Sequence, residues 1–142
     1  MGAVIRQATL DAVTAAARAA YPEECCGLLI GAKEGDRWRI DEAVAAANVA
    51  PRPRHDRFEI DPALHLRLQR ELRGTAQAVI GHYHSHPNGR AAPSRADLAQ
   101  AEDPSLLWLI AAVAGDAVKV AAFCLASDNF VEIDLKVEVG KP

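Results

Sequence analysis

The chain has 142 residues, of which 50% are hydrophobic and 25% are charged. These values are typical of one globular domain with its own core, and they exclude a disordered tail, a collagen-like chain and a disulfide miniprotein. The 16 basic and 19 acidic residues give a formal net charge of −3, which argues against a broad phosphate-binding surface, so we expect no nucleic-acid partner.

The cysteines and the apolar segments indicate the cellular location of the protein. Cys25 and Cys26 are adjacent, Cys124 is distant, and no Cys-x-x-Cys pair occurs, so we expect reduced thiols in a cytoplasmic protein. The N-terminal segment lacks the pattern of a signal peptide. The longest apolar run, residues 106–115, is about half a membrane span and is typical of a buried strand. We therefore expect no membrane partner.

Helices are predicted where apolar residues recur at helical spacing, over residues 7–20, from 61–62 to about 74, and from 94 to about 102. Apolar runs bounded by turn residues predict strands over 25–30, 38–49, 78–86, 106–114, 117–126 and 130–137. No linker or repeat divides the chain, so residues 1–142 are expected to form a single domain. Because helices and strands alternate early and strands follow one another late, the pattern predicts an α/β fold, with a mixed central β-sheet flanked by helices.

A candidate metal site lies at the end of the predicted strand 78–86. Successive side chains of a strand point to opposite faces, so His84 and His86 share one face, about 6–7 Å apart along the strand. After a short loop, Ser94 is expected to begin a helix that carries Asp97 in its first turn. Two imidazoles and one carboxylate leave a fourth tetrahedral position for water, which is the arrangement of a catalytic zinc site.

A zinc-bound water also needs a general base. Glu23 and Glu24 directly precede the predicted strand 25–30, which could pair beside the histidine strand and bring one of them to the metal. Sequence spacing alone does not choose between them. The Ser94 hydroxyl is the candidate hydrogen-bond donor to a developing oxyanion.

The spacing His84-x-His86, seven residues, Ser94, two residues, Asp97 resembles the JAMM (MPN+) zinc metallopeptidase motif. Residues 22–29 resemble the family's Pro-x-Glu-x-Cys-Gly-Leu-Leu segment, and residues 48–62 look like small bacterial members. The resemblance selects Glu24 as the catalytic glutamate and implies a fold similar to the cytidine deaminases. It further implies that His84, His86 and Asp97 bind Zn²⁺, that Glu24 activates water and that Ser94 steadies the tetrahedral intermediate.

The same resemblance implies hydrolysis of a peptide or isopeptide bond. The chain has no room for the insertions with which eukaryotic deubiquitinases hold ubiquitin. It looks like small prokaryotic members that cleave at the C-terminus of ubiquitin-like or sulfur-carrier proteins, some of them releasing cysteine, so we expect such a tail as the substrate. The alternative is a catalytically silent MPN-type scaffold that binds a partner protein, which the complete motif disfavours. A zinc deaminase is disfavoured because the Pro-Cys-x-x-Cys ligands are missing.

Simpler interpretations exist for several of these residues. Ser94 and Asp97 could form only a helix capping box, which is compatible with metal binding. His82 shares the strand face of the other histidines but lies about 13 Å from His86, so we interpret it as a packed residue. Cys25, beside the candidate base, could pack in the core or lie near the metal.

The sequence leaves two interpretations for each of two loops. The basic run 52–57 is either a solvated loop or a rim for an acidic partner. The loop 87–93 either leaves the zinc site open or closes over it.

Overall fold

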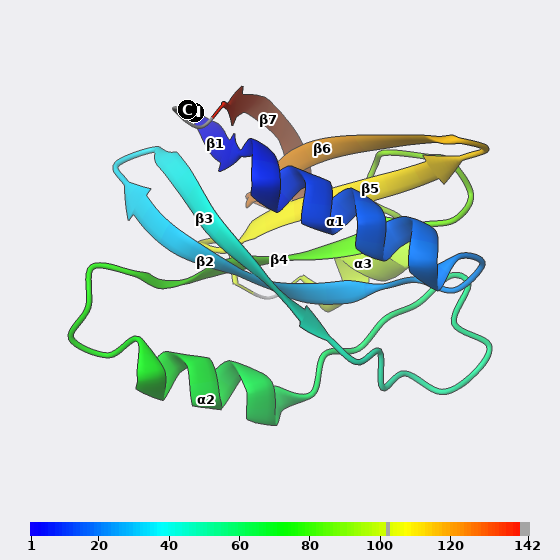
Figure 1. Ribbon diagram of the computed structural model, residues 1–142, viewed down its shortest axis with the longest axis horizontal. Coiled ribbons are helices and arrows are strands. Elements are labelled where there is room, and N and C mark those ends of the chain that lie inside the picture. Colours follow the sequence, from blue (N-terminus) through cyan, green and yellow to red (C-terminus); the bar gives the residue numbers. More distant parts are fainter. Residues whose placement is uncertain (102, 140–142) are drawn as a thin grey trace.

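The computed structural model describes residues 1–101 and 103–139. Most elements lie within a few residues of their predicted positions, although the predicted end of the third helix, residue 102, lies outside the described residues. In chain order, the elements are β1 (Gly2–Arg6), α1 (Gln7–Ala20), β2 (Cys26–Glu34), β3 (Arg37–Ala46), α2 (Pro62–Glu71), β4 (Ala78–His86), α3 (Arg95–Gln100), β5 (Leu107–Ala114), β6 (Ala117–Ala126) and β7 (Asn129–Glu138) (Figure 1).

Strand β1 was not predicted, and it changes the architecture. The strand order is β1-β3-β2-β4-β5-β6-β7, and β1 pairs in parallel with both β3 and β7, so the sheet closes into a barrel. The predicted mixed sheet is confirmed, because β4 and β5 are also parallel whereas the other neighbouring pairs are antiparallel. The expectation of a central sheet flanked by helices is wrong in detail, since β1 joins the two edges. Only Ala3 and Ile5 are buried in this strand, an alternation too short to stand out beside a helix.

Helix α1 covers one face of the sheet, and α3 lies on the opposite face (Figure 1). Val13 and Ala17 of α1 are fully buried and belong to the same core cluster as Leu29 of β2 and Leu109 of β5. Small side chains on α1 let the helix lie close to the sheet. Helix α1 therefore shields this face of the sheet from solvent, and a functional site would lie on the other face.

Side chains of β4 alternate between these two faces, as predicted. Tyr83 joins the cluster under α1, whereas His84 points to the opposite face, where the register aligns it with Cys26 of β2 and Ile110 of β5. Gly27 lies opposite Tyr83, and a Cβ on this glycine would overlap the tyrosine ring. The pair fixes how closely β2 approaches the strand that carries the histidines.

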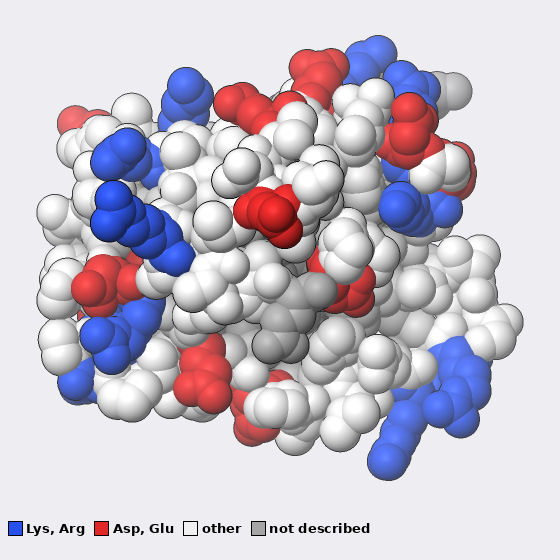
Figure 2. All heavy atoms as spheres, turned by 180° about the vertical axis from the view of Figure 1, so that it is seen from behind, with Lys and Arg blue, Asp and Glu red and all other residues white. Residues whose placement is uncertain are grey.

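Helix α2 begins where the sequence predicts, because the Asp61 carboxylate accepts a hydrogen bond from Ala63 N at 3.0 Å and Pro62 occupies the first turn. Its buried Leu68 packs in one cluster with Leu28 and Ile30 of β2. None of the described helices is both long and apolar enough to span a membrane. Seen from behind, basic side chains gather toward the edges of the molecule with acidic ones between them (Figure 2), in keeping with the small net charge.

Candidate metal and catalytic site

The end of β4 and the first turn of α3 bring the three predicted ligands together. His84 Nε2 and His86 Nε2 are 3.1 Å apart. Asp97 Oδ2 lies 3.1 Å from His86 Nε2 and 3.3 Å from His84 Nε2. All three side chains are buried, with at most 4% of each residue exposed.

This spacing fits a tetrahedral metal ion. Ligand atoms bound about 2.0–2.1 Å from such an ion lie about 3.3–3.4 Å from one another. Burial lowers the pKa of His84, which favours the neutral imidazole that a metal binds. Burial acts to raise the pKa of the Asp97 carboxyl, but hydrogen bonds with His84 and His86 outweigh it and hold this pKa well below its usual range. Burial also acts to lower the pKa of His86, but its hydrogen bonds with Asp97 and Arg90 O outweigh it and raise this pKa. The neutral His84 imidazole and the ionised Asp97 carboxylate are therefore ready to bind a cation, and His86 would bind one in its neutral form.

Asp97 is aimed by a capping box at the start of α3. Ser94 Oγ accepts a hydrogen bond from Asp97 N at 3.1 Å, and Ser94 N donates to Asp97 Oδ2 at 2.8 Å. The capping interpretation is thus confirmed, and it coexists with the convergence on the histidines. A six-residue helix is enough for this purpose because the cap fixes the carboxylate directly.

Glu24, rather than Glu23, lies beside the histidines. Glu24 is 5% exposed, and its carboxylate, His84 and His86 each offer one atom within 4.8 Å of the others, which is the spacing of a group able to hold a metal ion. Glu24 Oε1 has no hydrogen-bond partner among the described residues. Glu23 is half-buried and faces Arg52, with Nε and Oε2 3.7 Å apart. Burial raises the pKa of Glu24 to about 8, so this carboxyl is poised to exchange a proton near neutral pH.

The two candidate ligand histidines are held differently, and the sequence did not identify either support. His86 Nδ1 donates to Arg90 O at 2.9 Å, and in the neutral imidazole this bond leaves Nε2 unprotonated for a metal. His84 Nδ1 is buried without a partner among the residues described. Its ring instead stacks on Phe58, with centroids 4.3 Å apart and planes inclined by 15°. A lone aromatic residue in the polar loop 51–59 is the signal that could have pointed to Phe58.

His82 takes the packing position expected for it, and Cys25, for which two roles were left open, packs against the core cluster under α1. The His82 ring lies edge-on to Trp108, with centroids 4.2 Å apart, and burial lowers its pKa to about 3, so it is neutral. Cys25 N donates to Ser85 Oγ at 2.8 Å, and burial raises the pKa of the Cys25 thiol. A protonated thiol is a poor nucleophile.

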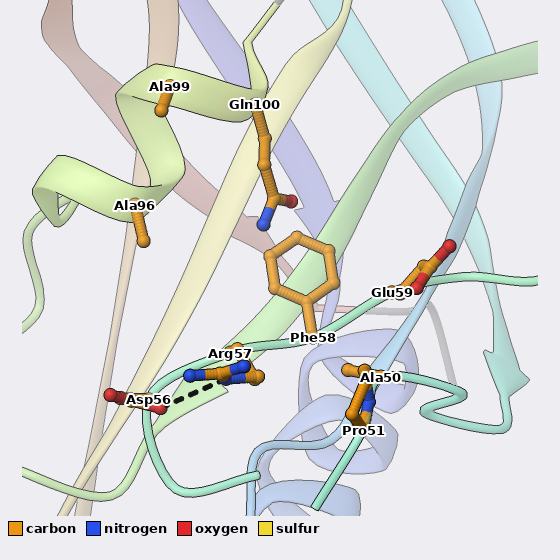
Figure 3. Close-up of a pocket in the computed structure, with 9 residues that line it drawn as sticks. All are labelled: Ala50, Pro51, Asp56, Arg57, Phe58, Glu59, Ala96, Ala99 and Gln100. Atoms are coloured by element: carbon orange, nitrogen blue, oxygen red, sulfur yellow. Dashed lines mark hydrogen bonds and ion pairs between the residues drawn. The ribbon is translucent and has the colours of Figure 1, made fainter.

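A cavity of about 710 Å³ lies between the 50–59 loop and α3 (Figure 3). Phe58 and Gln100 face one another across it, and the Arg57–Asp56 ion pair stands at one side. The cavity borders the helix that carries the Asp97 ligand position. Its lining residues are Ala50, Pro51, Asp56, Arg57, Phe58, Glu59, Ala96, Ala99 and Gln100.

Solved structures share this fold. A protein of Desulfitobacterium hafniense superposes with a TM-score of 0.85 at 27% identity, covering 97% of this chain and 94% of that one. A JAB1/MPN domain protein of Archaeoglobus fulgidus superposes with a TM-score of 0.60 at 22% identity, covering 96% of this chain and 99% of that one. The JAB/MPN fold that the motif implied is confirmed.

Sequence comparison gives the same family. The chain is 31% identical over 117 residues to a desampylase of Haloferax volcanii, covering 82% of this chain and 80% of that protein. It is 29% identical over 107 residues to a CysO-cysteine peptidase of Mycobacterium tuberculosis, covering 75% of this chain and 70% of that protein. The family described as prokaryotic homologs of the JAB domain matches residues 6–125. The chain belongs to this family of prokaryotic JAB-domain homologs.

Proposed function

We propose that the protein is a zinc-dependent metallopeptidase that hydrolyses a peptide or isopeptide bond at the C-terminus of a ubiquitin-like or sulfur-carrier protein. The observation that carries the proposal is the convergence of His84, His86 and Asp97 beside the buried Glu24 carboxylate, whose Oε1 has no hydrogen-bond partner in the described part of the chain. Relatives named a desampylase and a CysO-cysteine peptidase support both the reaction class and the substrate class.

His84, His86 and Asp97 would hold the metal. When bound, Zn²⁺ lowers the pKa of a water to about 7 and polarises a scissile carbonyl. Glu24 Oε1 accepts the proton of the attacking water and delivers it to the departing amine. Ser94 Oγ accepts the Asp97 N–H, which leaves its own hydrogen available to an oxyanion.

The cavity beside α3 suits an extended tail of small residues. Ala96, Ala99 and Gln100 line its helical side, and the two alanines leave room for a narrow chain there. A tail ending in Gly-Gly has this shape. The cavity starts at the helix of Asp97, which would place the end of the tail next to the reacting atoms.

The test combines metal content with turnover. Purified wild-type protein should contain about one zinc per chain, and His86→Ala and Asp97→Ala should lose it. Carrier proteins whose Gly-Gly tail is joined to cysteine, or through an isopeptide bond to a lysine peptide, should be cleaved, with products read by intact mass. Glu24→Gln should keep zinc and lose at least about 100-fold in kcat. A wild-type protein that binds no zinc, even after reconstitution, and cleaves neither substrate would leave the scaffold alternative in its place.

A further inference from the structure

The side chain of Asn48 uses both its donors and both its acceptor positions. Nδ2 donates to Glu24 O at 3.0 Å and to Arg57 O at 3.1 Å. Oδ1 accepts from Ala50 N and from Glu59 N, both at 3.1 Å. An amide offers two N–H hydrogens and two acceptor directions, so this side chain has no capacity left over.

These bonds reach both sides of the residue that stacks on His84. Arg57 and Glu59 flank Phe58, and each is tied to Asn48 by a backbone group. Val49 N adds a bond to Glu59 O at 2.9 Å, so the two limbs of the loop are joined at this point. Asn48 thereby fixes the backbone from which the Phe58 ring reaches the histidine.

The same amide holds the backbone of the proposed base. Glu24 lies two residues before the first residue of β2, outside the paired part of the strand. Its carbonyl accepts from Asn48, and its N–H donates to Arg54 O at 2.7 Å. Both backbone groups of Glu24 are therefore held by the 48–59 loop.

We infer that Asn48 is a positioning residue, which fixes both the Glu24 carboxylate and the Phe58 ring beside the proposed metal ligands. The inference rests on the proposed function, because it assigns Glu24 the role of base. Asn48 itself touches no reacting atom. A carboxylate displaced by about 1 Å costs up to about 100-fold in rate, so one amide can decide the turnover number without affecting the ligand set.

Two substitutions test this role. Asn48→Ala removes all four bonds, whereas Asn48→Asp keeps the size and the acceptor oxygen but places a second oxygen against Glu24 O and Arg57 O. Gln77→Ala is the matched control, since it removes an amide whose bond to Asp41 Oδ2, at 2.9 Å, lies away from the site. Circular dichroism at the assay temperature verifies that each variant is folded. If Asn48→Ala does not fold, the kinetic comparison is made with Asn48→Asp alone.

We expect both Asn48 variants to lower kcat by about 10- to 100-fold, with KM within about threefold of wild type and zinc still bound. Gln77→Ala should keep the wild-type kcat. Hydrogen–deuterium exchange of metal-free protein gives a second readout: segments 22–25 and 56–60 should exchange faster in the Asn48 variants than in Gln77→Ala.

The outcomes separate the two proposals. A wild-type protein without zinc or turnover refutes the peptidase, and unchanged exchange in segments 22–25 and 56–60 refutes the positioning role whatever the activity. With an active wild type, an unchanged kcat, a rise in KM alone or a loss of zinc in a folded Asn48 variant overturns the inference.

Discussion

Phe58 lies nearly flat on the ring of His84, with centroids 4.3 Å apart. A metal-binding histidine is usually oriented by a hydrogen bond to its other ring nitrogen. His84 Nδ1 has no such partner among the described residues, so the stacking contact with Phe58 is what orients this ring. The orientation of one proposed ligand thus depends on packing, while that of the other depends on the carbonyl of Arg90.

Phe58→Ala should therefore weaken zinc binding. Loss of an outer support typically costs 10- to 100-fold in metal affinity, and we expect a rise of about 10-fold in the zinc dissociation constant. Competition with a chromophoric chelator measures it. Phe130→Ala is the control, since Phe130 packs edge-on against Trp108 and not on a proposed ligand. Equal affinities of the two variants would contradict this role for Phe58.

The hydroxyl of Ser94 can be separated from its capping function. Ser94→Ala should lower the free energy of unfolding by about 1 kcal/mol through loss of the cap, whereas Ser94→Gly should cost only a few tenths. Both variants lack the hydroxyl, so both should lose about 100-fold in kcat if it stabilises the oxyanion. Chemical denaturation measures the unfolding free energy of the two variants, and steady-state kinetics measures their kcat. Wild-type kcat in Ser94→Gly would restrict Ser94 to capping.

Burial of Glu24 makes the stability of the metal-free protein depend on pH. Its folded-state pKa, about 8, lies above the ordinary value of 4.5, so the folded state retains a proton that the unfolded state has released. The stability that this proton supports is fully present below about pH 4.5 and is lost as pH rises toward 8 and beyond. Glu24→Gln cannot ionise and should gain stability relative to wild type across this window.

Urea unfolding of metal-free wild type and Glu24→Gln from pH 5 to 9 measures the difference. Taking the difference between the two proteins removes most of the contribution of His82, His84 and His86, which both proteins carry. A difference in unfolding free energy that stays constant over this range would show that Glu24 is ionised throughout.

Gly27→Ala should destabilise the fold. The added Cβ would overlap the Tyr83 ring and Val44 O, and overpacking of this kind costs about 1–3 kcal/mol. Thermal unfolding gives the shift in midpoint. Gly115→Asn is a suitable control, because Gly115 has φ +61, which asparagine tolerates, and the space around it is open. A smaller shift for Gly27→Ala than for the control would mean that β2 moves away without cost.

The sequence predicted what depends on local pattern. Strand parity placed His84 and His86 on one face, and the capping pattern placed Asp97 in the first turn of α3. The choice of Glu24 over Glu23 came from the family resemblance, since no periodicity describes the short segment before β2.

What the sequence could not predict depends on distant contacts. Asn48 lies 24 residues from Glu24, and its role follows from a loop path that no local pattern encodes. Strand β1 likewise gains its partners from β3 and β7, which contribute nothing to the pattern of residues 2–6. In both cases the missing information is which segments meet, and not which conformation each segment prefers.

The parallel pairing of β1 with β7 joins residues 2–6 to residues 134–138, nearly the whole length of the described chain. On the ribosome, β2, β3, β4 and α3 are all made before β7, so the pairing that brings the proposed ligands together can precede the closing of the sheet. Until the last strand emerges, β1 has one neighbour and the β6 edge stays unpaired. The segments that carry the proposed ligands are thus synthesised before the strand that closes the barrel, and a chain stalled before residue 129 would expose an open β-edge for aberrant pairing with other chains.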